Sequence, residues 1–79
     1  MTLDQLKPGE SAVIGHVDWP QLDPAEAKRL RALGVDEGAE IGVAHRGILG
    51  GRDPIAVRLG RMTIALRRAH ALAVEVRRA

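Results

Sequence analysis

The chain has 79 residues, a formal net charge of +2 at pH 7, no cysteine and a single aromatic residue, Trp19. A chain of this length forms one small domain, residues 1–79, which buries only about 60% of the surface that it exposes when unfolded. The lack of cysteine excludes disulfides and cysteine zinc sites, and it fits a reducing compartment. No stretch approaches the roughly 20 apolar residues of a membrane span, and no signal peptide is visible. We therefore expect a soluble, cytoplasmic protein without direct membrane insertion.

The twelve cationic and ten acidic residues are unevenly distributed. Seven of the cations lie between Arg52 and Arg78, whereas most of the acids lie in the first half. A basic half of this kind can contact nucleic acid, an anionic membrane surface or an acidic protein. A solvated strand face has the same composition, so charge alone does not predict a partner.

Alternation of apolar and polar residues predicts five short strands. The first covers Ser11 to Val17, with a bulge expected at Gly15. The others are expected over residues 40–46, 54–59, 62–66 and 72–77, with a brief turn over residues 68–71. Gly60 and Arg61 connect two of these strands as a tight hairpin. Alternation groups the residues of the last four strands by face. One face of each strand carries, in chain order, Ile41, Val43 and His45; Ile55, Val57 and Leu59; Met62, Ile64 and Leu66; and Leu72, Val74 and Val76.

One helix is predicted between the first two strands. Asp23 is its expected N-cap, Pro24 occupies the first helical position, and Glu26 follows three residues after the cap. Gly34 lies where a left-handed residue commonly ends a helix. We therefore expect a helix that begins at Pro24 and ends before Gly34, followed by a turn into the second strand.

Three glycines spaced by four residues, Gly34, Gly38 and Gly42, follow from this helix into the next strand. Gly38 is expected to turn the chain, and Gly42 to allow another segment to approach the strand closely. A phosphate-binding loop requires the order strand, glycines, helix. Here the order is helix, glycines, strand. The glycines are therefore predicted to end and turn backbone segments, and they do not predict a phosphate site.

Five short strands with one capped α-helix after the first strand predict a mainly β fold. A small SH3-like β-barrel is the economical arrangement, because closure removes the unpaired edges of a small sheet. An OB-fold is the alternative, but its helix normally lies between the third and fourth strands. The helix position therefore favours the SH3-like barrel.

Four segments in this order resemble the FeoA family, the ferrous iron transport protein A family. They are L-x-x-L-x-P-G at residues 3–9, R-L-x-x-L-G-V-x-x-G-x-E-I-x-V at 29–43, G-R-D-P-I-x-V-R-L-G at 51–60 and I-A-L-R-R-x-x-A at 64–71. The resemblance implies an SH3-like barrel without catalytic activity. It also implies an accessory role to a ferrous iron permease that has a cytoplasmic GTP-binding domain. Residues 17–22, which include Trp19, do not match the family pattern.

Aliphatic and aromatic residues in predicted loops form one candidate partner-binding surface. They are Trp19, Pro20, Leu22, Ile48 and Leu49, which could anchor a protein partner. The alternative is that Trp19 caps an open end of the barrel. Oligomeric state is not predicted, and a homo-oligomer stays open.

Four arginines of the predicted hairpin and the following turn form a second candidate surface. Arg58, Arg61, Arg67 and Arg68 are expected on the solvent side, where they could contact an acidic patch of the permease's cytoplasmic domain. The alternative is that these charges only keep the protein soluble.

No catalytic residue is predicted, because the chain lacks cysteine and tyrosine and nothing pairs Ser11, its only serine, with a histidine and a carboxylate. His16 and Asp18 are two residues apart on a strand and could hold a divalent metal together with Asp23 or His70. Surface histidines are the alternative. We therefore expect no resident cofactor, and leave weak binding of iron or zinc open.

A nucleic-acid-binding or regulatory barrel, related to the C-terminal domain of metal-dependent repressors, is the alternative function. The arginines permit it, but a single aromatic residue and a nearly balanced charge do not favour base stacking. We therefore expect no nucleic-acid partner.

Overall fold

The computed structural model describes residues 1–46 and 53–78, apart from the side chain of Arg46. The strands are β1 (Ser11–Val17), β2 (Glu40–Arg46), β3 (Ile55–Leu59), β4 (Met62–Leu66) and β5 (Val74–Arg78). The helices are α1 (Pro24–Leu33) and the one-turn α2 (Arg68–Ala71), with two short 3-10 turns, η1 (Leu3–Gln5) and η2 (Trp19–Gln21). None of the described helices is long and apolar enough to cross a membrane.

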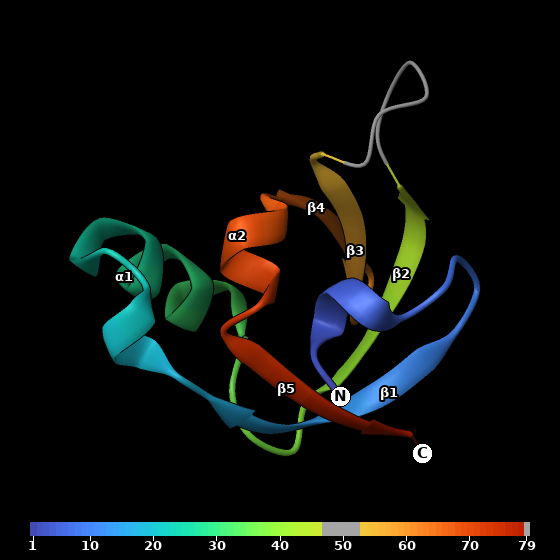
Figure 1. The fold of residues 1–79 in the computed structure, drawn as a ribbon, viewed down its shortest axis with the longest axis horizontal. Helices are drawn as coiled ribbons and strands as arrows, with labels where there is room; N and C mark the ends of the chain where they lie inside the picture. The colour runs from blue at the N-terminus through green and yellow to red at the C-terminus, as the bar shows by residue number, and fades with distance from the viewer. Residues whose placement is uncertain (47–52, 79) are drawn as a thin grey trace.

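The five strands form one antiparallel sheet with the order β4-β3-β2-β1-β5. The sheet curls around an apolar core, and both helices, α1 and α2, lie to the left of β2 and β3 in Figure 1. The predicted mainly β fold, with five strands and a helix after the first strand, is confirmed. Because β4 and β5 are not neighbours in the hydrogen-bonded order, both strands keep an outer edge.

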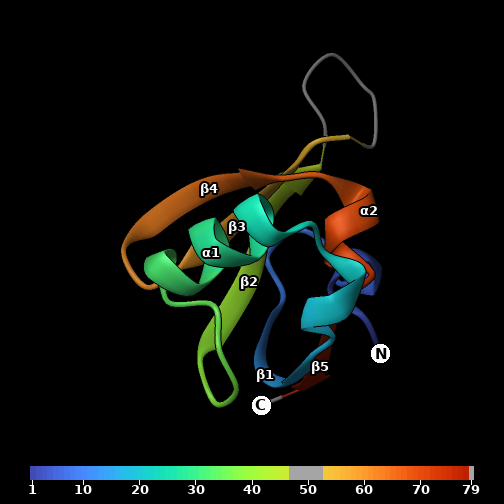
Figure 2. The same cartoon turned by 90° about the vertical axis from the view of Figure 1, so that its left-hand side faces the viewer.

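Helix α1 has both predicted ends. The Asp23 side chain accepts a hydrogen bond from the Glu26 amide at 2.8 Å, which satisfies a donor of the first turn. Gly34 ends the helix at φ 102°, a left-handed conformation that costs glycine little. Figure 2 shows the helix beside the long arc of β4, and Arg29 of α1 donates to the backbone oxygen of Ala65 in β4 at 3.2 Å.

Two irregularities shape the central strands. The register between β1 and β5 shifts between Ile14 and His16, which confirms the predicted bulge at Gly15. A second shift, between Val43 and His45 on β2, was not predicted. It interrupts the alternation, so that Ile41 and Val43 are buried whereas His45, predicted on the same face, is exposed.

Gly42 in β2 allows the predicted close approach. A Cβ at this position would lie 2.9 Å from the backbone oxygen of Glu10, closer than real Cβ contacts allow. The same Glu10 oxygen accepts a hydrogen bond from the Val43 amide at 3.3 Å, and the Gly9 amide donates to the Val43 oxygen at 2.8 Å. The turn before β1 is therefore tied directly to the centre of the sheet.

The outer edge of β5 is covered by the first residues of the chain. The Val76 amide donates to the backbone oxygen of Met1 at 2.8 Å, and Thr2 forms an isolated antiparallel bridge with Glu75. Leu3 and Leu6, around η1, are fully buried in the core. This N-terminal cover, residues 1–6, lies near β5 in Figure 1.

Two residues of the predicted apolar strand faces, Met62 and Leu72, are exposed. Residues 68–71 form α2 instead of a simple turn, and Leu72 caps it in a helical conformation, so the final strand begins later than predicted. The Leu72 side chain is 50% exposed as a result. Met62 is the first residue of β4 after the β3–β4 turn, and it is 41% exposed because it lies at the end of the strand, beyond the core.

Candidate partner-binding surfaces

Trp19 stands at the start of η2, with its ring half-buried against the core. The Arg31 guanidinium of α1 lies 4.2 Å from the ring centroid, a favourable cation–π geometry. Pro20 beside it is exposed. The indole thus attaches the β1–α1 connection to α1 while part of its surface still faces solvent.

Leu22, predicted as an exposed anchor beside Trp19, is only 6% exposed and belongs to the core. That prediction is wrong: after η2 the chain directs this side chain inward, just before Asp23 caps α1. A single leucine in a polar connection has no periodicity from which its direction could be read. Ile48 and Leu49 lie outside the described residues.

The four predicted arginines are all exposed, but they do not form one continuous face. Arg58 on β3 pairs across from Thr63, and Arg61 lies in the β3–β4 turn. Arg67 and Arg68 lie beyond the other end of β4. Arg61 and Arg67 flank the five residues of β4, so they are roughly 20 Å apart at about 3.3 Å per residue. None of the ion pairs among the described residues involves these side chains.

The four candidate metal ligands are not brought together. His16 is exposed, with its Nδ1 3.7 Å from a Glu37 carboxylate oxygen, whereas His70 lies next to Glu26. Asp18 accepts a hydrogen bond from the Gln21 side chain, and Asp23 caps α1. Over residues 1–46 and 53–78, no group of three or more His, Asp or Glu side chains could hold a metal ion. The described residues therefore do not fit a resident metal.

Glu26 connects α1 to α2, a contact that the sequence did not predict. One carboxylate oxygen accepts from Arg29 Nε at 2.7 Å, and the other lies 2.9 Å from Nδ1 of His70 in α2. The hydrogen bond from Arg29 holds the pKa of Glu26 below its usual range, although burial opposes this, and the charge of His70 adds to the lowering. The three-residue spacing of Glu26 and Arg29 could have predicted their pairing. Nothing local in the sequence predicts the contact with His70.

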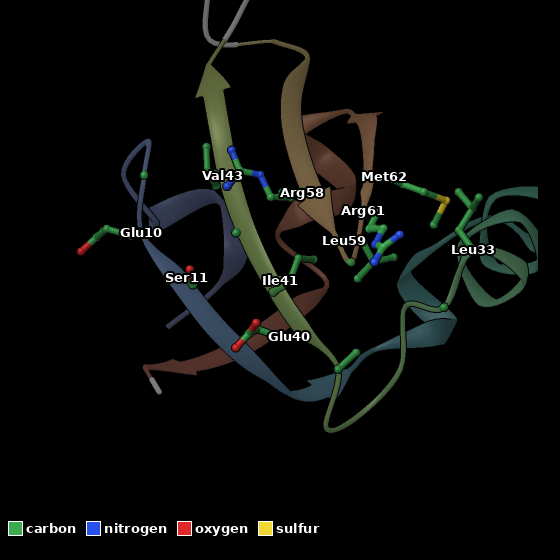
Figure 3. Close-up of a pocket in the computed structure, with 15 residues that line it drawn as sticks. Glu10, Ser11, Leu33, Glu40, Ile41, Val43, Arg58, Leu59, Arg61 and Met62 are labelled. Carbon is green, nitrogen blue, oxygen red and sulfur yellow. The ribbon is translucent and has the colours of Figure 1, made fainter.

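A pocket of about 470 Å³ lies along β2, between the end of α1 and the β3–β4 turn. Arg61 and Met62 lie on the side of that turn, and Glu10 and Ser11 lie on the opposite side of β2 (Figure 3). Within the described part of the chain, no hydrogen bond joins Ser11 to a histidine or a carboxylate. The pocket thus mixes both charge signs with apolar walls and gathers no nucleophile–base pair.

The FeoA domain model matches residues 1–78 of this chain, almost its whole length. The chain belongs to the FeoA family. Members of the FeoA family are accessory proteins of ferrous iron transport, and the resemblance found in the sequence is confirmed. No curated protein sequence matches this FeoA-family chain significantly.

Solved FeoA structures share both sequence and fold with this chain. FeoA of Stenotrophomonas maltophilia, solved with zinc, is 38% identical with a TM-score of 0.81, covering 98% of this chain and 89% of that one. That protein is described as a prokaryotic SH3 domain protein and as a candidate activating factor of ferrous iron transport. FeoA of Chlorobium tepidum is 35% identical with a TM-score of 0.84, covering 99% of this chain and 70% of that one. The predicted SH3-like fold is thereby confirmed.

A manganese-dependent transcriptional repressor contains the same fold. The two chains are 19% identical with a TM-score of 0.80, over all of this chain and 41% of the repressor. At this identity the likeness concerns the fold alone.

Proposed function

We propose that this FeoA-family chain is a non-catalytic, cytoplasmic accessory protein of ferrous iron uptake. It acts by binding the cytoplasmic GTP-binding part of a ferrous iron permease. The match of the FeoA domain to residues 1–78 carries this proposal. The description of the S. maltophilia relative as a candidate transport activating factor supports it.

Two surface features support a binding role. Trp19 is an aromatic side chain with part of its surface exposed, the residue type that most often anchors protein interfaces. Arg58, Arg61, Arg67 and Arg68 are exposed charges without ion pairs among the described residues, and they can attract an acidic partner. Neither feature has the base or nucleophile geometry that catalysis requires.

The test is a binding titration of the full chain with the permease's cytoplasmic GTP-binding part, without nucleotide, with GDP and with a GTP analogue. We expect saturable binding in at least one nucleotide state. Trp19→Ala should weaken it by roughly tenfold, as for an aromatic anchor. Leu72→Ala is the matched control, because Leu72 is an exposed apolar residue on another element. Absence of binding in every nucleotide state contradicts the proposal.

A nucleic-acid-binding function is the second candidate, favoured by the shared fold with the repressor and by the exposed arginines. Two features oppose it. The arginines lie in two pairs at opposite ends of β4, and Arg31 covers one face of the Trp19 ring, leaving less of it for base stacking. Titration of DNA and RNA at increasing salt separates the functions, because a steep decline of affinity with salt indicates phosphate contacts.

A further inference from the structure

The β3–β4 hairpin fixes which backbone groups of β4 face away from the sheet. Its loop has two residues, Gly60 and Arg61, so the flanking pair Leu59 and Met62 exchanges hydrogen bonds. In an antiparallel ladder every second pair exchanges no hydrogen bonds, and here these pairs include Thr63 and Ala65 of β4. The N–H and C=O groups of Thr63 and Ala65 therefore point to the outer edge. Both residues are exposed.

This outer edge of β4 is largely open among the described residues. Outside the β3–β4 ladder, the only hydrogen bond to it within that part of the chain is the one from Arg29 to the Ala65 oxygen. The groups left without such a bond are both amides and the Thr63 oxygen. An exposed row of this kind is a template for another strand.

The charges around the edge define what kind of strand it can accept. Arg58 and Arg61 lie near one end of β4, and Arg67 and Arg68 lie at the other. An extended segment paired along β4 would pass between the two pairs. Acidic side chains on that segment would meet an arginine at each end, while basic ones would be repelled.

Charge disfavours a second copy of this chain at the edge in the register centred on Ile64. Antiparallel pairing of two β4 strands centred on Ile64 would place Arg61 of one copy opposite Arg67 of the second copy. This occurs twice in a two-fold dimer, and like charges directly opposite each other destabilise strand pairs. The charges therefore disfavour self-pairing and favour a partner of opposite charge.

We propose that the outer edge of β4 binds an extended acidic segment of a partner protein as an added strand. Hydrogen bonds from Thr63 and Ala65 hold the segment's backbone, and the flanking arginines select its charge. That this partner is the cytoplasmic part of the permease rests on the proposed function. The binding of an acidic strand at the β4 edge does not depend on it.

The first experiment uses a synthetic peptide of about eight residues that alternates valine and glutamate, followed by amide hydrogen exchange and NMR titration of the full chain. We expect saturable binding, with added protection of the Thr63 and Ala65 amides. A peptide with lysine in place of glutamate should bind at least about tenfold more weakly. The acidic peptide N-methylated at alternate residues, which lacks the donors of one edge, should lose binding as well.

Charge reversal in the protein gives the second experiment. The double variant R61E/R67E should weaken binding of the acidic peptide by roughly tenfold and improve binding of the lysine peptide. The matched control is R77E, an exposed arginine on β5, which should change neither affinity. Unchanged thermal midpoints verify that the variants are folded.

Three results would overturn the proposal: equal affinity for the acidic and lysine peptides, protection at residues other than those of β4, or a dimer of the chain alone that protects Thr63 and Ala65. The permease titration has a separate outcome. Peptide binding without permease binding rejects the proposed function only, and permease binding without peptide binding rejects the edge proposal only.

Discussion

The sheet has two outer edges, and the chain protects them in different ways. The β5 edge is covered by backbone, through the hydrogen bond from Val76 to Met1 and the bridge between Thr2 and Glu75. The β4 edge has little backbone cover among the described residues and is flanked by arginines instead. Cover excludes every partner, whereas charge excludes only partners of the same sign. A small domain can thus prevent self-association at one edge and still keep it available for binding.

Removing the anchor of the covered edge should have the largest effect. Leu3 is fully buried, so Leu3→Ala should lower the free energy of unfolding by about 2–5 kcal/mol. Ile64→Ala on β4 is the control, because Ile64 is only partly buried and should cost less. Urea unfolding of both variants measures the difference. An equal loss at the two positions would mean that the sheet depends on both edges alike.

The strand between the two edges gives the second test. Gly42→Ala places a methyl group against the Glu10 oxygen, and a backbone atom cannot move aside easily, so we expect a loss of about 1–3 kcal/mol. Gly15→Ala in β1 is the matched control. Its methyl would meet only the flexible Arg77 side chain at 3.4 Å, so we expect a change below about 0.5 kcal/mol. Similar losses in thermal unfolding would show that the close approach is unimportant.

Glu26, which holds Arg29 of α1 near the β4 edge, should contribute less to the free energy of unfolding, and its contribution should depend on pH. The folded pKa of Glu26 is lowered, so its contribution is fully present above the unfolded pKa of about 4.3 and is lost as pH falls through the lower folded value. Glu26→Gln should cost about 1 kcal/mol at pH 7, and this difference should shrink under acid.

Urea unfolding between pH 7 and pH 3 checks this expectation. Glu40→Gln is the control, because Glu40 is exposed and forms no ion pair among the described residues. A Glu26→Gln deficit that stays constant down to pH 3 would argue that the carboxylate charge does not contribute.

The smallest effect concerns single amides of the unmodified protein. The Val76 amide donates to Met1, whereas the Thr63 and Ala65 amides have no such acceptor among the described residues, so Val76 should exchange more slowly. Hydrogen exchange followed by NMR compares the three directly. Strong protection of Thr63 and Ala65 in the free monomer would mean that the β4 edge is already covered.

The local elements could be predicted because their signals are short-range. The cap at Asp23, the left-handed Gly34 and the hairpin at Gly60 each depend on a few neighbouring residues, and all three appear in the structure. The cover over β5 could not be predicted. It pairs Thr2 with Glu75, and a residue at the start of the chain shows no local preference for a strand at its end.

The candidate surfaces were predicted less well than the fold. Alternation along β3 and β4 correctly placed Arg58 on the solvent side, but it says nothing about distance along the strand, so the split between Arg61 and Arg67 was missed. The polar neighbours of Leu22 predict a surface position, but the direction of its side chain depends on tertiary packing, which buries it. Surfaces combine segments that are distant in sequence, and one sequence does not reveal those combinations.

The contact between Trp19 and Arg31 also has an experimental consequence. The chain contains one tryptophan and neither tyrosine nor phenylalanine, so its near-ultraviolet emission comes from a single indole. That indole reports on the attachment of the β1–α1 connection to α1, and lies on elements other than the β4 edge. A ligand that changes the emission alters the surroundings of Trp19, whereas a ligand that binds without an optical signal leaves this attachment unchanged.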